Sequence, residues 1–137
     1  MESTEYKLEF ISFDVQKVLF DRNTNDREYE FGVNVKQALI DINESEESVF
    51  RAGFLVEITG TSEEKPISIK VEAGGIFKIH NAPPHEVVEN FKYISAPSIV
   101  YPYLRSFISL LTLNAGLNPV NLPPVNFLKQ YKESQAE

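Results

Sequence analysis

The sequence predicts an α+β fold, in which a four-stranded antiparallel sheet carries helices packed on one face. Apolar and polar residues alternate through most of residues 5–79, and the apolar period lengthens to that of helices over residues 85–135. The strands thus precede the helices instead of interleaving with them. With 137 residues the chain is expected to form a single domain, residues 1–137. One helical layer leaves sheet edges exposed, so an oligomer is also expected.

Four segments of the first half predict strands. The opening segment, residues 6–20, is apolar on both of its faces. Residues 28–35 and residues 49–60 place an apolar side chain at nearly every second position, as a half-buried strand requires. Residues 67–73 alternate in the same way, and the polar turn before them predicts a long hairpin with the preceding strand. The glycine pair in "GGIF", residues 74–77, is interpreted as a bulge or bend at the end of this strand.

The second half predicts three helices. Residues 84–94 form a short helix in this interpretation, which Pro97 closes. Ser98 is then the N-cap of a longer helix, and Gly116 supplies its C-terminal stop. Residues 126–137 are expected to form a terminal amphipathic helix.

The loop "NPVNLPPVNF", residues 118–127, contains three prolines and several apolar side chains. Because proline lacks a backbone N–H, this loop cannot form regular helix or an interior strand. We expect it to roof an apolar groove that binds other chains.

Composition predicts a cytoplasmic protein. Cysteine is absent, which excludes disulfides and thiolate catalysis and fits a reducing compartment. The opening residues, "MESTEYKLEF", lack the basic start and apolar run of a signal peptide. The most apolar run, residues 99–113, is too short to span a bilayer, for which about 20 residues are needed. We therefore expect neither export by a signal of its own nor membrane insertion.

The net charge of −7 is uneven. Residues 1–64 hold 15 acids and 6 bases, whereas residues 65–137 hold 5 acids and 7 bases. Nucleic acids and anionic membranes are poor partners for such a chain, because binding them relies on clustered Lys and Arg. A basic protein partner is favoured.

The sequence predicts no catalytic residues, no metal and no cofactor. Nucleotide-binding glycine motifs and the G-x-S-x-G nucleophile motif are absent. His85, Glu86 and Glu89 imitate half of an H-E-x-x-H zinc motif, but Glu89 replaces the second histidine and His80 is the remaining imidazole. We interpret this segment as a solvated helix start, and the protein as no enzyme.

The second half of the sequence resembles the SecB family of bacterial export chaperones. Three motifs carry the resemblance in order and spacing: "GGIFKI" at 74–79, "APSIVYPYLRSFISLL" at 96–111 and "NLPPVNF" at 121–127. The resemblance covers residues 74–131 well and the first half mainly in strand order. It implies a cytoplasmic homotetramer, a dimer of dimers, that works without ATP. Such proteins hold unfolded or precursor polypeptides in a hydrophobic groove and deliver them to the motor SecA for translocation.

The resemblance also implies which residues line the groove. Apolar residues of the second strand, of the loop between the helices and of the last helix supply it in the family, and Leu128 is added as a local neighbour. The positions in this sequence are Tyr29, Phe31, Val33, Leu122, Val125, Phe127, Leu128 and Tyr131. Core packing is the alternative role for each of them.

An acidic patch on the exposed sheet face receives the basic, zinc-bound tail of SecA in the family. Asp14 matches one acid of that patch, but Phe10 and Lys70 stand at two further acidic positions and Ser68 at an adjacent apolar one. A different acidic patch is expected from Glu9, Glu57 and Glu72. The substitutions also favour an alternative function, a SecB-like chaperone dedicated to a single client such as an antitoxin. A third possibility is a non-chaperone oligomeric domain whose groove is filled by its own side chains.

Overall fold

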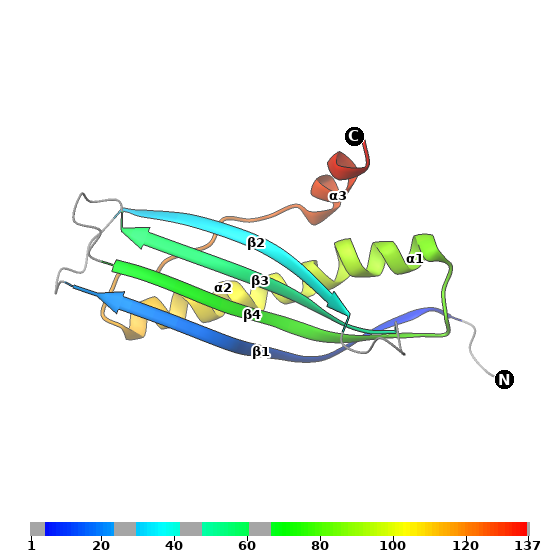
Figure 1. The fold of residues 1–137 in the computed structure, drawn as a ribbon, viewed down its shortest axis with the longest axis horizontal. Helices are drawn as coiled ribbons and strands as arrows, with labels where there is room; N and C mark the ends of the chain where they lie inside the picture. Colours follow the sequence, from blue (N-terminus) through cyan, green and yellow to red (C-terminus); the bar gives the residue numbers. More distant parts are fainter. Residues whose placement is uncertain (1–4, 24–29, 42–47, 61–66, 137) are drawn as a thin grey trace.

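The computed structural model describes residues 5–23, 30–41, 48–60 and 67–136. A four-stranded antiparallel sheet forms one layer, and the helices cover one of its faces (Figure 1). The predicted fold class is therefore confirmed. The elements in chain order are β1 (Lys7–Arg22), β2 (Phe31–Asp41), β3 (Val49–Gly60), β4 (Ile67–His80), α1 (His85–Asn90), the π-helical turn η1 (Phe91–Ser95), α2 (Ala96–Asn114) and α3 (Phe127–Gln135).

The strands lie in the order β1-β4-β3-β2, so β1 and β2 are the edges of the sheet. Apolar residues of β3 and β4 meet across the ladder, as in the pairs of Val56 with Val71 and Ile58 with Ile69. All four are buried, and the predicted alternation of these strands is confirmed. The core lies between this sheet face and the buried side chains Val100, Tyr101, Leu104 and Ile108 of α2. We call the opposite side, turned away from the helices, the open face.

Two irregularities in β1 explain why this segment is apolar on both faces. The pairing with β4 skips one residue between Phe10 and Ser12 and another between Val15 and Lys17. Each extra residue in a strand shifts the following side chains to the other face. The helix-facing side of β1 therefore receives apolar residues in three successive pairs: Leu8 and Phe10, Phe13 and Val15, and Val18 and Phe20.

The interpretation of the glycine pair as a strand end was wrong, because Gly74 and Gly75 lie in the middle of β4. A Cβ atom on Gly75 would stand 2.6 Å from Cγ2 of Val100, so this glycine lets α2 approach the sheet closely. A Cβ atom on Gly74 would stand 2.7 Å from the carbonyl oxygen of Ala52. Both glycines are required by close packing within a continuous strand.

The predicted break between two helices at Pro97 was also wrong. Helical structure continues from α1 through η1 into α2, and Ser98 is an interior residue whose hydroxyl donates to the Ile94 carbonyl at 2.5 Å. Pro97 lies in the first turn of α2, where a missing N–H is tolerated. The wider π-helical turn before it, in which the N–H of Ala96 bonds to the carbonyl of Phe91, connects the two helices.

The C-terminal end of α2 is held from two sides. Gly116 has a φ of 85°, which confirms it as the stop. Arg22, at the end of β1, donates from Nη1 to the Ala115 carbonyl at 2.6 Å, and a cation at this end also complements the helix dipole. None of the helices in the described part of the chain combines the length and apolar composition that crossing a membrane requires.

Thr112 fastens the proline-rich loop to α2. Its side chain is fully buried, donates to the Ile108 carbonyl at 2.9 Å and accepts the N–H of Val120 at 2.9 Å. A buried N–H that loses its acceptor costs about 1–3 kcal/mol. This one hydroxyl therefore positions the beginning of the loop.

We expect Thr112→Val, which keeps the shape and removes the hydroxyl, to lower the free energy of unfolding by about 1–3 kcal/mol. Urea unfolding followed by circular dichroism measures the change. Thr59→Val, on the exposed side of β3, is the matched control and should stay within about 0.5 kcal/mol of the parent. Equal stability of the two variants would contradict the role of Thr112.

Candidate functional site

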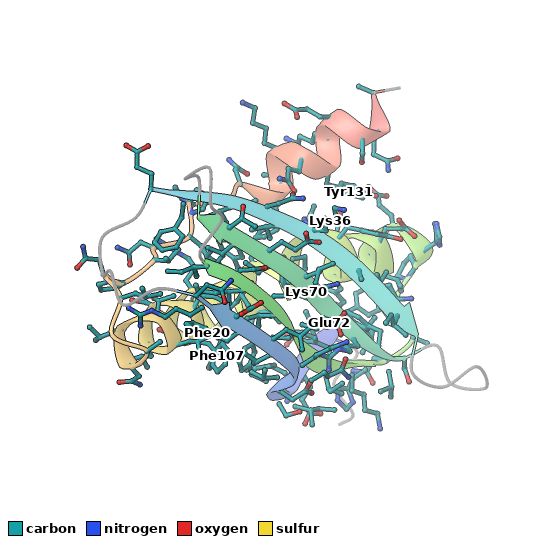
Figure 2. All side chains as sticks on the ribbon, turned by 60° about the vertical axis from the view of Figure 1, so that its left-hand side comes forward. Phe20, Lys36, Lys70, Glu72, Phe107 and Tyr131 are labelled. Carbon is teal, nitrogen blue, oxygen red and sulfur yellow. The ribbon has the colours of Figure 1, made fainter. Side chains whose placement is uncertain are left out.

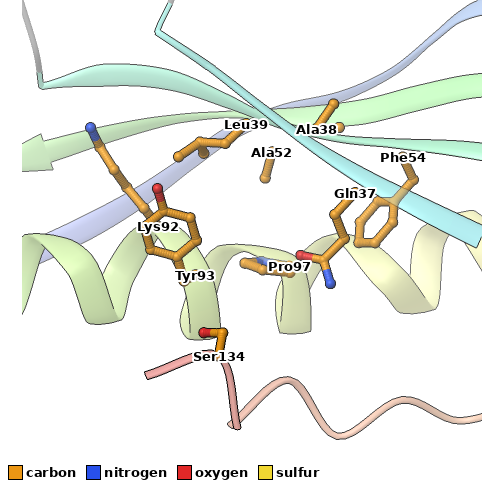
Figure 3. Close-up of a pocket in the computed structure, with 10 residues that line it drawn as sticks. Gln37, Ala38, Leu39, Ala52, Phe54, Lys92, Tyr93, Pro97 and Ser134 are labelled. Carbon is orange, nitrogen blue, oxygen red and sulfur yellow. The ribbon is translucent and has the colours of Figure 1, made fainter. Parts of the chain in front are cut away.

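A cavity of about 310 Å³ lies between the sheet and the helices, at the side of the edge strand β2. Residues of β2 and β3 form one wall, η1 and the start of α2 form another, and α3 lies at the outside (Figure 3). A smaller hollow of about 180 Å³ adjoins it and shares three of its residues. The lining of the larger cavity consists of Gln37, Ala38, Leu39, Ala52, Gly53, Phe54, Lys92, Tyr93, Pro97 and Ser134.

The cavity exists because α2 packs off the centre of the sheet. Its closest contacts are with β4, β1 and β3, so β2 extends beyond the helical layer. Beside β2 on the helix-facing side, the cavity is bounded by η1, by the first turn of α2 and by α3. A groove therefore runs beside the edge strand.

Leu122 and Phe127 of the predicted groove face the core. Leu122 is 1% exposed and Phe127 is 5% exposed. The Phe127 ring packs against Phe54, with centroids 6.0 Å apart, and against Tyr101 at 5.5 Å. The hydroxyl of Tyr101 in turn donates to the Pro123 carbonyl at 2.5 Å, and burial raises the pKa of Tyr101. These side chains build the inner wall that supports the loop.

Other predicted residues remain accessible beside β2 and α3. Phe31 and Val125 are half-buried at the margin of the core, and Val33 is 37% exposed. Tyr131 stacks on Tyr93 with ring centroids 5.7 Å apart. Burial raises the pKa of Tyr131, and the negative charge of Glu89 raises it further.

Leu128 and Tyr29 stand apart from this group. Leu128 is 46% exposed and lies with Lys129 and Lys132 on a different side of α3 from Tyr131 and Ser134. Tyr29 lies outside the described residues.

Sequence reasoning missed Gln37, Tyr93 and Pro97 of the cavity wall. Gln37 had a detectable signal, since it is a polar residue at an otherwise apolar phase of β2. Tyr93 had none, because its position depends on the π-helical turn. Lys92, from the same turn, lies with Nζ 5.7 Å from the centroid of the buried Phe50 ring.

All four acids of the predicted SecA-docking patch lie on the open face, and each has a basic neighbour there. Glu57 pairs with Lys70 across the ladder and Glu72 pairs with Lys17. Lys70 and Glu72 follow each other along β4 on this face (Figure 2).

Two of these acids are engaged by side chains of the same sheet. Asp14 forms an ion pair with Arg51, which is 6% exposed and reaches across the strands where Gly53 and Gly74 leave room. Oε1 of Glu9 forms a hydrogen bond with Nε2 of His80 at 2.7 Å, and this bond lowers the pKa of the Glu9 carboxyl.

Phe10 does not belong to the open face. Because it pairs with Phe77 before the first irregularity of β1, it points under the helices and packs against Phe77 and Tyr103. Matching Phe10 to an acidic surface position was therefore wrong for this chain.

Charge is balanced over the described residues. The chain has 20 acids and 13 Lys or Arg, of which nine acids and two bases lie outside the described ranges. Eleven of each remain in the described ranges. The sheet and helices thus have no net acidic character.

Comparison with known proteins agrees with this architecture. The family model described as "Preprotein translocase subunit SecB" matches residues 10–137. "Protein-export protein SecB" of Azoarcus sp. (strain BH72) is 33% identical over 96 residues, which are 69% of this chain and 63% of that protein. The protein of the same name from Paraburkholderia xenovorans (strain LB400) is 26% identical over 134 residues, covering 91% of this chain and 85% of that protein.

The matched region spans about three fifths of the length of the first curated relatives. Among solved structures, the Mycobacterium tuberculosis Rv1957 SecB-like chaperone, in complex with a ChAD peptide from the Rv1956 HigA1 antitoxin, superposes with a TM-score of 0.68. That alignment covers 87% of this chain and 88% of the other at 14% identity, which supports the fold.

Proposed function

Because the chain belongs to the SecB family, we propose that it is an ATP-independent chaperone that holds unfolded or precursor polypeptides for export. The observation that carries this proposal is the cavity beside the edge strand β2, between the sheet and the helices. An extended client segment fits there because its apolar side chains leave water, at about 25 cal/mol per Å² of buried apolar surface. Its main chain can add to a sheet edge irrespective of sequence.

The client contacts in this proposal differ from the full set implied by the resemblance. Phe31 and Val33 on β2, with Val125 and Tyr131 opposite, contact the client, and Tyr93 joins them. Tyr29, which the resemblance also places in the groove, lies outside the described residues and stays a prediction. Leu122 and Phe127 support the groove from inside, and Leu128 contacts clients only at its outer margin.

We also propose that copies of the chain assemble through α2 and β1. Exposed apolar residues on α2 are spaced by four, seven and three residues, which places them on one side of the helix as in a helix-packing seam: Ile99, Tyr103, Leu110 and Leu113. Neighbouring β1 exposes Val15, Val18 and Phe20 on its helix-facing side. Burying both surfaces against other copies suits a homotetramer, in which several weak client sites act together.

A second candidate is a chaperone of this family dedicated to one client. The balanced charge of the open face favours it, because Asp14, Glu9, Glu57 and Glu72 all have basic neighbours and a basic SecA tail gains little there. In the export proposal, by contrast, SecA docks on these four acids.

The groove is tested by mixing the protein with an unfolded client and no nucleotide, and measuring aggregation by light scattering. The parent protein should suppress aggregation, and Val33→Asp should lose most of this effect because a charge replaces an apolar contact. Asn34→Asp adds the same charge at an exposed position on the opposite side of β2, so it is the matched control and should act like the parent. Unchanged aggregation with the parent protein would rule out the holdase function.

Self-association is tested by Leu110→Glu, which places a charge in the exposed seam of α2. Sedimentation should show a tetramer for the parent and a smaller species for the variant. Arg105→Glu, elsewhere on the exposed surface of α2, serves as the control. A monomeric parent would contradict assembly through α2.

Titration with a C-terminal peptide of SecA distinguishes general export from a dedicated client. Micromolar binding that Asp14→Asn and Glu72→Gln weaken would support export through the open face. Binding at least tenfold weaker than micromolar would favour the dedicated client, because it would mean that the balanced charges of this face do not attract the basic tail; calorimetry measures the affinity.

A further inference from the structure

Gln37 interrupts an apolar row on the helix-facing side of β2. Phe31, Val33, Val35 and Leu39 occupy the neighbouring positions of that side, and the residue opposite Gln37 on β3 is Phe54. A side chain that carries both a donor and an acceptor is costly at such a position once water is excluded. Gln37 is exposed in this structure, so it needs a partner in place of water only when a bound chain covers it.

In this structure the partner belongs to α3. Nε2 of Gln37 donates to Oε1 of Gln130 at 3.0 Å, across an exposed gap. Figure 3 shows the Gln37 side chain extending from β2 into the cavity, toward Pro97. An exposed amide–amide bond exchanges with water at little net cost, so it is easily replaced.

α3 itself is attached weakly. Phe127 is its only buried residue in the described part of the chain, and a helix of nine residues has little stability alone. Beyond Phe127, α3 meets the rest of the molecule through the Tyr131–Tyr93 stack, the Gln130–Gln37 bond and an interaction of Tyr131 with Glu89. A segment entering the groove therefore has only a few contacts to displace.

We infer that Gln37 binds the main chain of a client, exchanging the Gln130 amide for a peptide group; this rests on the chaperone function proposed above. Oε1 of Gln37 accepts a client N–H and Nε2 donates to a client C=O, the two groups that every peptide unit offers. A client that covers β2 excludes water from Gln37 and displaces the Gln130 amide. The peptide group of the client then supplies the hydrogen bonds that both had made.

In this role Gln37 fixes the register of a bound client along the groove without selecting a particular sequence. Client side chains lie over Phe31, Val33 and Leu39, where apolar groups are favoured. A peptide group lies over Gln37, because an apolar side chain placed there would bury the amide without a partner. Gln37 thus determines where along an extended client the apolar contacts fall.

The test compares the parent with Gln37→Leu, which suits the apolar surroundings and should fold normally by circular dichroism. The probe is a fluorescein-labelled peptide of alternating phenylalanine and serine, together with a series in which single peptide N–H groups are replaced by ester oxygens. The parent should lose about threefold to tenfold in affinity at one or two ester positions, as expected for a lost hydrogen bond. Gln37→Leu should bind the all-amide peptide more weakly by a similar factor and lose nothing further at those positions.

Gln135→Leu, at the exposed end of α3, is the matched control and should show the ester pattern of the parent. Tighter or unchanged binding by Gln37→Leu would overturn the inference and assign the glutamine pair to a latch between β2 and α3. An unchanged ester pattern in Gln37→Leu would overturn it as well. If the parent binds neither the peptide nor reduced, carboxymethylated α-lactalbumin, the chaperone function fails first, and the inference with it.

Discussion

The close contact between α2 and the middle of β4 is the constraint on which the rest of the molecule depends. Val100 approaches Gly75 so closely that a single added methyl group would collide with it. This contact draws the long helix over β4, β3 and β1 and leaves β2 outside the helical layer. The groove beside β2 is therefore a consequence of where one glycine stands.

The proline-rich loop fills part of the space that α2 leaves. Val120 and Leu122 bury their side chains, while Thr112 and Tyr101 hold the loop backbone by hydrogen bonds at two points. Prolines suit this position because an extended segment over an apolar wall has no ladder to supply partners for backbone N–H groups. The loop is thus both a part of the core and a wall of the candidate groove. α3 follows directly after it in the chain.

The two faces of the sheet have different chemistry. Among the described side chains, the helix-facing side is apolar apart from Gln37 of β2 and Arg22 at the end of β1, whereas the open face alternates acids and bases across neighbouring strands. Arg51 and Asp14 pair above the two central glycines, so the acid that best matches the family's docking patch already has a cation beside it. Membership of the SecB family and the interaction surface of this particular chain are therefore separate questions.

Local periodicity by itself determined much of this protein. The alternation in β3 and β4 predicted which side chains are buried, Gly116 predicted the end of α2, and three motifs indicated the family. Tertiary structure decided the rest, because it depends on contacts between distant segments. Phe10 lies under the helices because of the pairing of β1 with β4. Pro97 does not end a helix, because it lies in the first turn of α2 just after the π-helical turn. Leu122 and Phe127 face the core, although their motif suggested a groove. No local pattern distinguishes an apolar side chain that meets its own core from one that meets a guest, since both leave water for the same reason.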